Sequence, residues 1–270
     1  MRTQALDPPI AVGRTAEVYA WQENLVLKLF YAWCSPDWVQ QEIEVGRVIA
    51  TMHLPTPKLI DTVIIEERHG IIYERVDGPS LLTLSGSKPW LVLHLARQLA
   101  ELHTQIHKQD GSFFPPLNSA LYSTIQQMEQ LPSSLKIDLL RLVEKLPDGN
   151  ALCHCDFHPD QVLITAKGPV IIDWPTARRG NPLADVARTS ILLMIGQVPY
   201  ANWAMRTFVD LWRGLFYRTY LSRYIELHPG ISRDDITTWM IPIAAARLEE
   251  GIQGEQKPLL NFIQSHLPVQ

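Results

Sequence analysis

The densest run of chemically reactive side chains covers residues 153–161, Cys-His-Cys-Asp-Phe-His-Pro-Asp-Gln. Asp156 is expected in an irregular loop before a short strand, where an acid can project into a cleft and accept a proton from a hydroxyl group. Asp173 follows the apolar residues 170–172, and its carboxylate and the amide oxygen of Gln161 are hard ligands suited to Mg²⁺. Either acid alone is more simply interpreted as a helix cap or a solvated loop residue, but their shared hairpin favours a joint site.

The same run allows a second interpretation, because cysteine and histidine are zinc ligands. Cys153, His154, Cys155 and His158 follow one another so closely that they cannot easily surround an ion as a tetrahedron, and no second CxxC pair completes the set. Free cysteines that pack as small apolar side chains explain the pattern more simply. A structural zinc site stays an alternative.

A lone lysine marks a second region of interest. Lys28 is the charged residue of the apolar segment 25–30, a position typical of an edge strand or of a side chain that extends toward water. Glu42 lies fourteen residues later in a predicted helix, where it could pair with Lys28 and direct the ammonium group toward a phosphate. Glu44 is the competing partner.

A glycine-containing turn precedes the lysine. Gly13, Arg14 and Thr15 lie between candidate strands, and successive backbone N–H groups in such a turn could hold phosphate oxygens. An ordinary hairpin turn explains a single glycine equally well. The turn alone therefore decides nothing.

The elements that position these residues change in kind near residue 77. Before it, β-branched and aromatic residues predict strands at 18–21, 25–30, 63–65 and 70–73, with a helix from 36 to about 52. After it, apolar spacing predicts helices at 89–107, 118–131, 133–146 and from about 182 to the end, interrupted by a hairpin within 161–172. The break at 75–79 is a candidate hinge. We predict an α+β fold with a small sheet-containing N-terminal lobe, 1–77, and a larger, mainly helical C-terminal lobe, 78–270.

Composition limits the class of protein. The 270 residues suffice for one large or two modest domains, and 24 basic against 28 acidic residues leave a net charge of −4. This charge argues against general nucleic-acid binding. Three cysteines form a poor disulfide framework and fit a reducing compartment. The longest strongly apolar stretch is far shorter than a membrane span, so we expect a cytoplasmic protein without a membrane partner.

Taken together, these segments resemble the aminoglycoside phosphotransferase and choline kinase-like family, whose fold is similar to that of protein kinases. The pattern His154-x-Asp156-x-x-x-x-Gln161 resembles the catalytic loop of the family. Residues 171–174, Ile-Ile-Asp-Trp, resemble its metal-binding segment, and Gly-Asn-Pro-Leu-Ala-Asp-Val-Ala follows at 180–187. Residues 38–42 with Leu-Pro-Thr-Pro at 54–57 resemble a helix and its exit, which favours Glu42 over Glu44.

The resemblance implies a bilobal, protein kinase-like enzyme that transfers the γ-phosphoryl group of ATP, with Mg²⁺, to a hydroxyl of a small molecule. Asp156 would be the catalytic base, Asp173 the main Mg²⁺ ligand and Gln161 a second ligand. Lys28, oriented by Glu42, would anchor the phosphates.

Further roles follow from the same resemblance. The backbone around Glu74 and Val76, in a segment similar to the family's hinge, would hold the adenine. His154 would brace the catalytic loop, and Asp185 would cap a helix and support that loop. The sequence departs from the family at Gln161, where asparagine is usual, and at Cys155 and Asp160, where glycine is common.

The acceptor is a small molecule whose identity the sequence leaves open. Residues 201–270 contain seven acids and seven bases, so this region has no acidic excess to attract a polycationic antibiotic. Several aromatic residues there could line a sugar-like or choline-like site, although core packing is the simpler role for most: Trp203, Trp212, Tyr217, Tyr220, Tyr224 and Trp239. A nucleotide-binding pseudokinase that acts as a sensor or scaffold, marked by Gln161, is the alternative without catalysis.

Overall fold

The computed structural model of the protein describes residues 6–196 and 203–267. The chain forms two compact units, Met1–Ser80 with Gln161–Pro175, and Leu81–Asp160 with Thr176–Gln270. The first unit thus ends close to the predicted boundary at 77, but it also includes residues 161–175, which the prediction assigns to the C-terminal lobe. Backbone hydrogen bonds explain this grouping, since the N–H of Ile171 donates to the Pro55 carbonyl and that of Ile164 to the Pro79 carbonyl.

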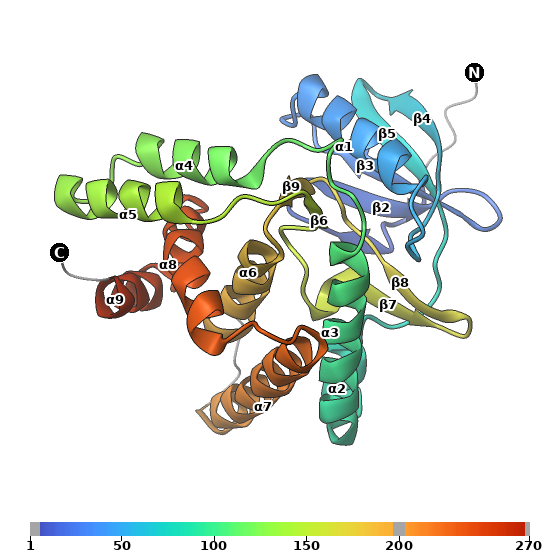
Figure 1. Ribbon diagram of the computed structural model, residues 1–270. Helices are drawn as coiled ribbons and strands as arrows, with labels where there is room; N and C mark the ends of the chain where they lie inside the picture. The colour runs from blue at the N-terminus through green and yellow to red at the C-terminus, as the bar shows by residue number, and fades with distance from the viewer. Residues whose placement is uncertain (1–5, 197–202, 268–270) are drawn as a thin grey trace. The chain divides into compact units, whose positions relative to one another are not determined.

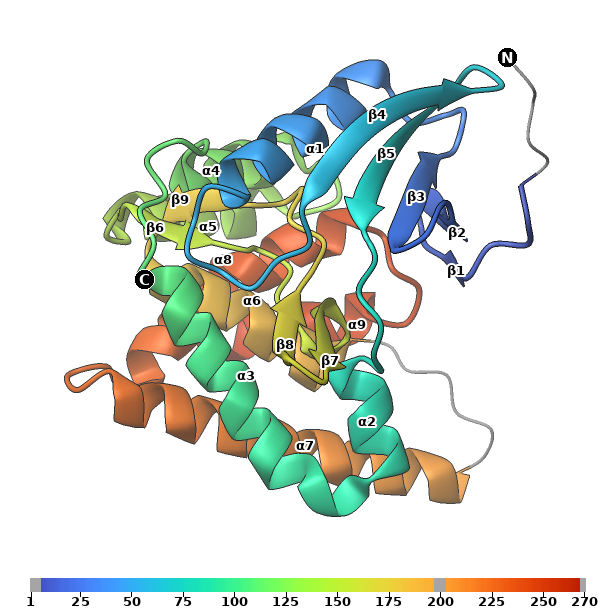
Figure 2. The same ribbon diagram turned by 90° about the vertical axis from the view of Figure 1, so that its right-hand side faces the viewer.

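The first unit is built on a five-stranded antiparallel sheet. Its strands lie in the order β1-β2-β3-β5-β4: β1 (Ala11–Val12), β2 (Ala16–Ala20), β3 (Leu25–Phe30), β5 (Arg68–Glu74) and β4 (Leu59–Ile65). Glu66 and Glu67 connect β4 to β5 and both have positive φ angles, 48° and 63°, as a two-residue hairpin turn requires. Figure 2 shows this hairpin along the edge of the sheet.

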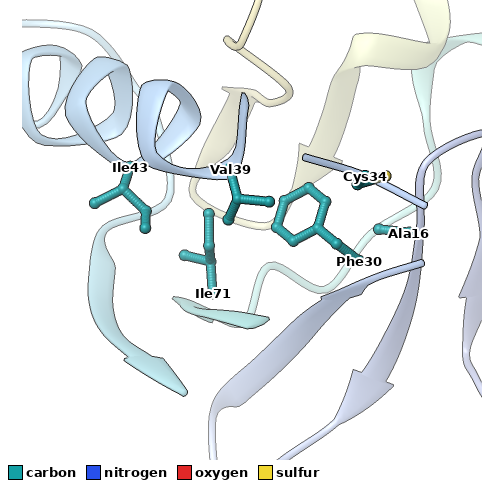
Figure 3. Close-up of a cluster of buried hydrophobic side chains, with 6 residues drawn as sticks. All are labelled: Ala16, Phe30, Cys34, Val39, Ile43 and Ile71. Atoms are coloured by element: carbon teal, nitrogen blue, oxygen red, sulfur yellow. The ribbon is translucent and has the colours of Figure 1, made fainter. Parts of the chain in front are cut away.

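Helix α1 (Pro36–Ile49) covers one face of the sheet. The Ser35 side chain accepts a hydrogen bond from the Trp38 N–H, and Pro36 supplies the first turn, so the helix begins where capping chemistry predicts. Phe30 packs with Val39 and Ile43 in the core beneath the helix (Figure 3).

The other face of the sheet has its own apolar cluster, Tyr19, Leu27, Leu29 and Ile72. Side chains alternate between the faces of a strand, so Lys28 shares the face of Phe30, the face that α1 covers. The alternation therefore brings the lysine to α1.

A short hairpin completes the first unit. Strands β7 (Val162–Thr165) and β8 (Gly168–Ile171) pair antiparallel, with Val162 opposite Ile171, and Gly168 takes a φ of 120° at the turn. This register places Gln161 and Ile172 together, where the N–H of Ile172 donates to the Gln161 carbonyl at 3.0 Å. Gln161, just before the hairpin, and Asp173, just after it, therefore lie at the same end of the hairpin.

The second unit is mainly helical. Its helices are α2 (Leu81–Ser87), α3 (Val92–His107), α4 (Leu117–Gln127), α5 (Ser133–Lys145), α6 (Pro182–Ile195), α7 (Trp203–Leu227), α8 (Arg233–Glu249) and α9 (Gln256–His266), with a 3-10 turn at Pro89–Leu91. A second 3-10 turn, Pro159–Gln161, ends with the first residue of the segment that belongs to the first unit. Helix α3 packs on α7, α6 on α8 and α4 on α5 (Figure 1). Strands β6 (Ala151–Cys153) and β9 (Arg178–Gly180) pair beside them. None of the helices in the described part of the chain is long and apolar enough to cross a lipid bilayer.

Candidate functional site

Lys28 lies at the centre of an ion-pair cluster in the first unit. Its Nζ atom is 2.6 Å from Oε1 of Glu42 and 3.0 Å from Oδ1 of Asp173. Glu44, the competing partner, instead accepts a hydrogen bond from the Gln40 side chain. The ion pair predicted between Lys28 and Glu42 is therefore present.

Burial shapes the electrostatics of this cluster. It acts to lower the pKa of Lys28, but the carboxylates of Glu42 and Asp173 outweigh it and raise that pKa, so the ammonium is charged at neutral pH. Burial raises the pKa of Glu42, and Lys28 only partly offsets this effect. The hydroxyl of Tyr73 donates to Oε1 of Glu42 at 3.3 Å, whereas Oε2 has no hydrogen-bond partner among the described residues. The Glu42 carboxylate thus depends on Lys28.

Asp173 and Gln161 meet at the open end of the β7–β8 hairpin. The amide Nε2 of Gln161 donates to Oδ2 of Asp173 at 3.3 Å, and the Asp173 side chain is 38 % exposed. Asp173 has a φ of 64°, a left-handed backbone that is uncommon for aspartate and that clusters at functional sites. The two carboxylate oxygens and one amide suit a hard cation, because turning the amide over presents its oxygen in place of its NH₂ group.

The glycine-containing turn joins β1 to β2. The N–H of Gly13 donates to the Ala16 carbonyl at 2.8 Å, and the Thr15 carbonyl accepts from the Tyr31 N–H. The φ of Gly13 is not in the left-handed region, so the turn does not require glycine for its backbone conformation. Arg14 is exposed at the tip of the turn.

The predicted hinge begins where β5 ends. The N–H of Glu74 donates to the Lys58 carbonyl, and that of Arg75 to the Asn24 carbonyl, which ties the end of the strand to two neighbouring segments. Val76 follows in irregular backbone and is half-buried. Both candidate adenine-binding residues are thus in the first unit, as are the candidate phosphate and metal residues.

Asp156 lies in the second unit, in the irregular segment after β6. Its Oδ1 is 3.4 Å from Nη2 of Arg188 in α6, and its Oδ2 is 3.8 Å from Nε2 of His158. The same guanidinium contacts Glu250 at 2.5 Å. Nε of Arg188 is buried without a hydrogen-bond partner in the part of the chain that the structure describes. Asp156 is therefore a partly exposed carboxylate beside a half-buried cation.

Asp185 fixes the backbone before Asp156. The fully buried carboxylate accepts from the N–H of His154 at 2.6 Å and from that of Cys155 at 2.8 Å. The prediction that Asp185 caps a helix is wrong, because the N-cap of α6 is Asn181, whose side chain accepts from the Leu183 N–H. Asp185 lies one turn later, and its carboxylate supports the loop.

Two histidines complete the surroundings of Asp185. Nε2 of His103 is 3.0 Å and Nε2 of His107 is 3.4 Å from Oδ2 of Asp185, although the His103 contact is poorly aligned for a hydrogen bond. The hydroxyls of Tyr220 and Tyr224 lie 2.7 and 2.8 Å from the respective Nδ1 atoms. Burial lowers the pKa of His103, and burial together with His103 lowers that of His107 to about 4.

This arrangement sets the protonation of the group. Burial acts to raise the pKa of Asp185, but interactions with His103 and His107 outweigh it and hold that pKa well below its ordinary value. Both rings are neutral at pH 7, with N–H groups toward Asp185 and tyrosine hydroxyls donating to the opposite nitrogens. The group thus stabilises the backbone of His154 and Cys155 without a net positive charge.

Sequence reasoning missed the histidines and Arg188, although their spacing carried a signal. His103 and His107 are four residues apart on α3 and therefore lie on one face, the buried face of that helix. Arg188 follows Asp185 by three residues on α6, so the two side chains leave neighbouring positions. Neither spacing indicates which residues far along the chain these side chains contact.

The cysteines do not form the zinc site considered above. Among the described residues, the group of three potential ligand side chains with atoms within 4.8 Å of one another is His103, His107 and Asp185, and not a set from 153–158. Burial and nearby Asp185 raise the pKa of the Cys153 and Cys155 thiols well above the ordinary value. Neutral, largely buried thiols match the interpretation of small apolar side chains.

Most of the chain matches the sequence pattern of a known protein family. Residues 8–230 match the sequence pattern of the phosphotransferase enzyme family, which covers most of the chain. The chain belongs to this family. No curated protein gives a match.

Solved structures of kinases share the fold of this family member. An amicoumacin kinase in complex with AMP-PNP and Ca²⁺ has a TM-score of 0.61 and 15% identity, over 97% of this chain and 89% of that one. An aminoglycoside-3'-phosphotransferase of type VIII has a TM-score of 0.60 and 19% identity, over 87% and 90%. A choline/ethanolamine kinase family protein from Mesorhizobium loti has a TM-score of 0.55 and 14% identity, over 94% and 88%. The predicted family and α+β kinase-like fold are confirmed.

Proposed function

We propose that the protein transfers the γ-phosphoryl group of ATP to a hydroxyl of a small molecule. One observation carries the proposal: a buried glutamate in α1 holds a strand lysine that also contacts Asp173, the residue after the β7–β8 hairpin. A Lys–Glu pair and a metal-binding aspartate are the parts that kinases of this fold need for phosphoryl transfer. The contacts lie within one compact unit.

Lys28 would bind phosphate oxygens of ATP. Glu42 holds the ammonium from the buried side, and its short 2.6 Å contact restricts where Nζ can lie. The lysine then needs little reorganisation when a phosphate arrives, which is how pre-placed charge lowers a barrier. The backbone near Glu74 and Val76 would hold the adenine, and the Gly13-Arg14-Thr15 turn would lie over the phosphates.

The donor set at the end of β8 fits Mg²⁺. Asp173 would be the main ligand and Gln161 the second, because carboxylate and amide oxygens suit this cation. When bound, Mg²⁺ would neutralise charge on the phosphates. Gln161 is longer than the usual asparagine by one methylene, yet its side chain already lies within 3.3 Å of Asp173.

Asp156 would align the acceptor hydroxyl and take its proton. The hydroxyl oxygen forms a bond to phosphorus while the bond to the bridging oxygen of ADP breaks, and the electron pair of that bond leaves with ADP. Arg188, 3.4 Å from the carboxylate, fixes its orientation. His154 and Asp185 keep the loop backbone in place through the two N–H contacts described above.

The experiment that tests this function measures ADP release against a broad panel of small alcohols, with Mg·ATP, for the wild type and two matched variants. Glu42→Gln removes the buried carboxylate charge, whereas Glu44→Gln changes an exposed neighbour on the same helix. We expect Glu42→Gln to lower ATP use at least about tenfold and Glu44→Gln to leave it unchanged. Mg-dependent ATP binding without ADP release on any acceptor would favour the sensor or scaffold instead.

A further inference from the structure

The second unit contains a cavity of about 530 Å³. This volume is in the range of sites that hold small organic ligands. Helices α2, α6 and α7 and the segment after α8 supply much of its wall, and apolar side chains are the largest group in the lining, among them Leu82, Leu192, Leu193, Val209, Trp212 and Ile252. The cavity therefore offers apolar contact area to a ligand.

The charged groups at this cavity compensate one another. Nε and Nη2 of Arg247 contact the two carboxylate oxygens of Glu255 at 2.7 and 3.0 Å, and both residues are buried. The guanidinium of Arg213 donates to the carbonyls of Leu193 and Leu192. Asp160 is an exposed carboxylate of the lining. One acid paired with arginine and one exposed acid do not make a site for several ammonium groups.

The indole N–H of Trp212 is a polar group at this cavity that could select for a hydrogen-bond acceptor on a ligand. Its Nε1 atom is buried and has no hydrogen-bond partner within the described ranges. A buried N–H without an acceptor costs about 1–3 kcal/mol, so an ether, carbonyl or hydroxyl oxygen of a ligand would be stabilising once a rotation of the indole exposes this atom to the cavity. Tyr220, Tyr224 and Trp239 are fully buried, as core packing predicts, and Trp203 is outside the residues whose side chains the structure describes.

The cavity adjoins the loop that carries Asp156. His158 lines the cavity, and its Nε2 is 3.8 Å from Oδ2 of Asp156. A chain of ion pairs also connects the two places: Arg188 contacts Asp156 and Glu250, and Glu250 contacts Arg247 of the cavity lining. One side chain, that of His158, therefore separates the cavity from the candidate base.

We infer that the cavity binds the body of the phosphate acceptor, and that this acceptor is an alcohol with a largely apolar body, one hydrogen-bond acceptor for Trp212 and no cluster of positive charges. The inference rests on the proposed function, because it names the substrate class of that reaction. It separates this protein from relatives whose names record aminoglycoside substrates. Apolar contact supplies affinity, and the compensated charges exclude a polycation.

Two glycines provide matched variants for a test. Gly86 lines the cavity on α2, and Gly214 is on α7 outside the lining. A Cβ atom at either position meets nothing within 4 Å, and neither glycine has a left-handed φ, so both should accept leucine. Gly86→Leu narrows the cavity and Gly214→Leu is the control. Trp212→Phe removes the N–H while keeping an aromatic ring.

Binding is measured by isothermal titration calorimetry with three apolar alcohols, 4-phenylbutan-1-ol, geraniol and farnesol, and with gentamicin as the polycation. We expect at least one alcohol to bind the wild type more tightly than gentamicin does. Gly86→Leu or Trp212→Phe should weaken that binding at least tenfold, while Gly214→Leu binds as the wild type does. No alcohol binding at millimolar concentration, tighter binding of gentamicin, or unchanged binding in both cavity variants would overturn the inference.

Turnover separates this inference from the proposed function. The same alcohols are tested as acceptors by ADP release with Mg·ATP, and ATP binding is measured without acceptor. Cavity-dependent alcohol binding with no ATP binding and no ADP release would refute the phosphotransferase function while leaving the selectivity of the cavity. ADP release with gentamicin and no alcohol binding would refute the substrate class while leaving the phosphotransferase function.

Discussion

Removing the charge of Lys28 should make the stability of the protein depend on pH in a new way. Lys28→Met leaves Glu42, which is 4 % exposed, with the Tyr73 hydroxyl at 3.3 Å as its hydrogen-bond donor among the described residues. A buried carboxylate that has lost its cation takes up a proton instead of remaining charged. Asp173, by contrast, is exposed enough for water to replace the contact it loses.

The size of the effect follows from the cost of that proton. An unfolded glutamate has a pKa of about 4.3, so holding the Glu42 carboxyl protonated costs up to about 4 kcal/mol at pH 7 and about 1 kcal/mol at pH 5. The folded variant binds a proton that the unfolded chain does not, so its stability falls as pH rises. In the wild type, Lys28 offsets part of this cost.

Urea unfolding at pH 5, 6 and 7 measures the difference between the wild type and Lys28→Met. We expect the difference to grow by up to about 3 kcal/mol between pH 5 and pH 7. The double variant Lys28→Met with Glu42→Gln lacks the titrating group and should show a difference that does not change with pH. An equal difference in stability at pH 5 and pH 7, or a difference that still changes with pH in the double variant, would refute the reasoning.

Three further predictions concern the candidate base Asp156, the candidate metal ligand Gln161 and the buried His107. Asp156→Asn should keep ATP affinity, measured by calorimetry, and lower ADP release at least about a hundredfold, because a base acts on the acceptor; lost affinity with an unchanged rate would contradict its role. Gln161→Asn should be tolerated and Gln161→Leu severe in Mg²⁺ titrations of ATP consumption, since leucine supplies no oxygen; equal curves for wild type and Gln161→Leu would remove this residue from the metal site. Below pH 6.5 His107 takes up a proton in the unfolded chain but not in the folded protein, where its pKa is about 4. The free energy of unfolding should therefore fall toward pH 4 by an amount on the order of 3 kcal/mol. Thermal unfolding of His107→Gln should show a smaller fall, and an equal fall would exclude this histidine as the cause.

The cluster around Lys28 could be predicted because its rules are local. Strand alternation places Lys28 on the face of Phe30, and the capped start at Ser35 sets which side of α1 reaches that face. Glu42 and Glu44 differ by about 200° around a helix, so only one of them can lie on the buried side. The residues alone leave this choice open, the resemblance to the family favours Glu42, and the structure shows that Glu42 is the one on the buried side.

The support of the Asp156 loop could not be predicted in the same way. The resemblance to the family implied that Asp185 caps a helix, and an aspartate in the first turn of a helix commonly interacts with that helix. The structure instead uses Asn181 as the cap and turns Asp185 toward backbone 30 residues earlier. The partners of the histidines are more distant still, since His103 and Tyr220 are 117 residues apart. Such pairs depend on the packing of α3 against α7.

Short elements escaped prediction for another reason. Strands β6 and β9 have three residues each, too few for an alternating pattern to show. Helix α2 has seven residues and includes Gly86 and two serines, which disfavour a helix on propensity alone. Tertiary packing holds these elements, since β6 and β9 pair across residues 154–177, which include the β7–β8 hairpin.

Besides the hairpin turns at Asn24 and at Glu66 and Glu67, two residues with a left-handed backbone lie beside the candidate chemistry. Cys155, directly before Asp156, has a φ of 62°, and Asp173 has one of 64°. A left-handed conformation costs a side-chain-bearing residue about 1–2 kcal/mol, which accounts for the glycine that is common in the family at the position of Cys155. The structure offsets this cost with specific contacts: Asp185 accepts from the Cys155 N–H, and Lys28 and Gln161 hold the Asp173 carboxylate. Backbone strain persists only where several surrounding contacts hold it. These two left-handed residues are therefore better explained by the direction they give to the carboxylates of Asp156 and Asp173 than by packing.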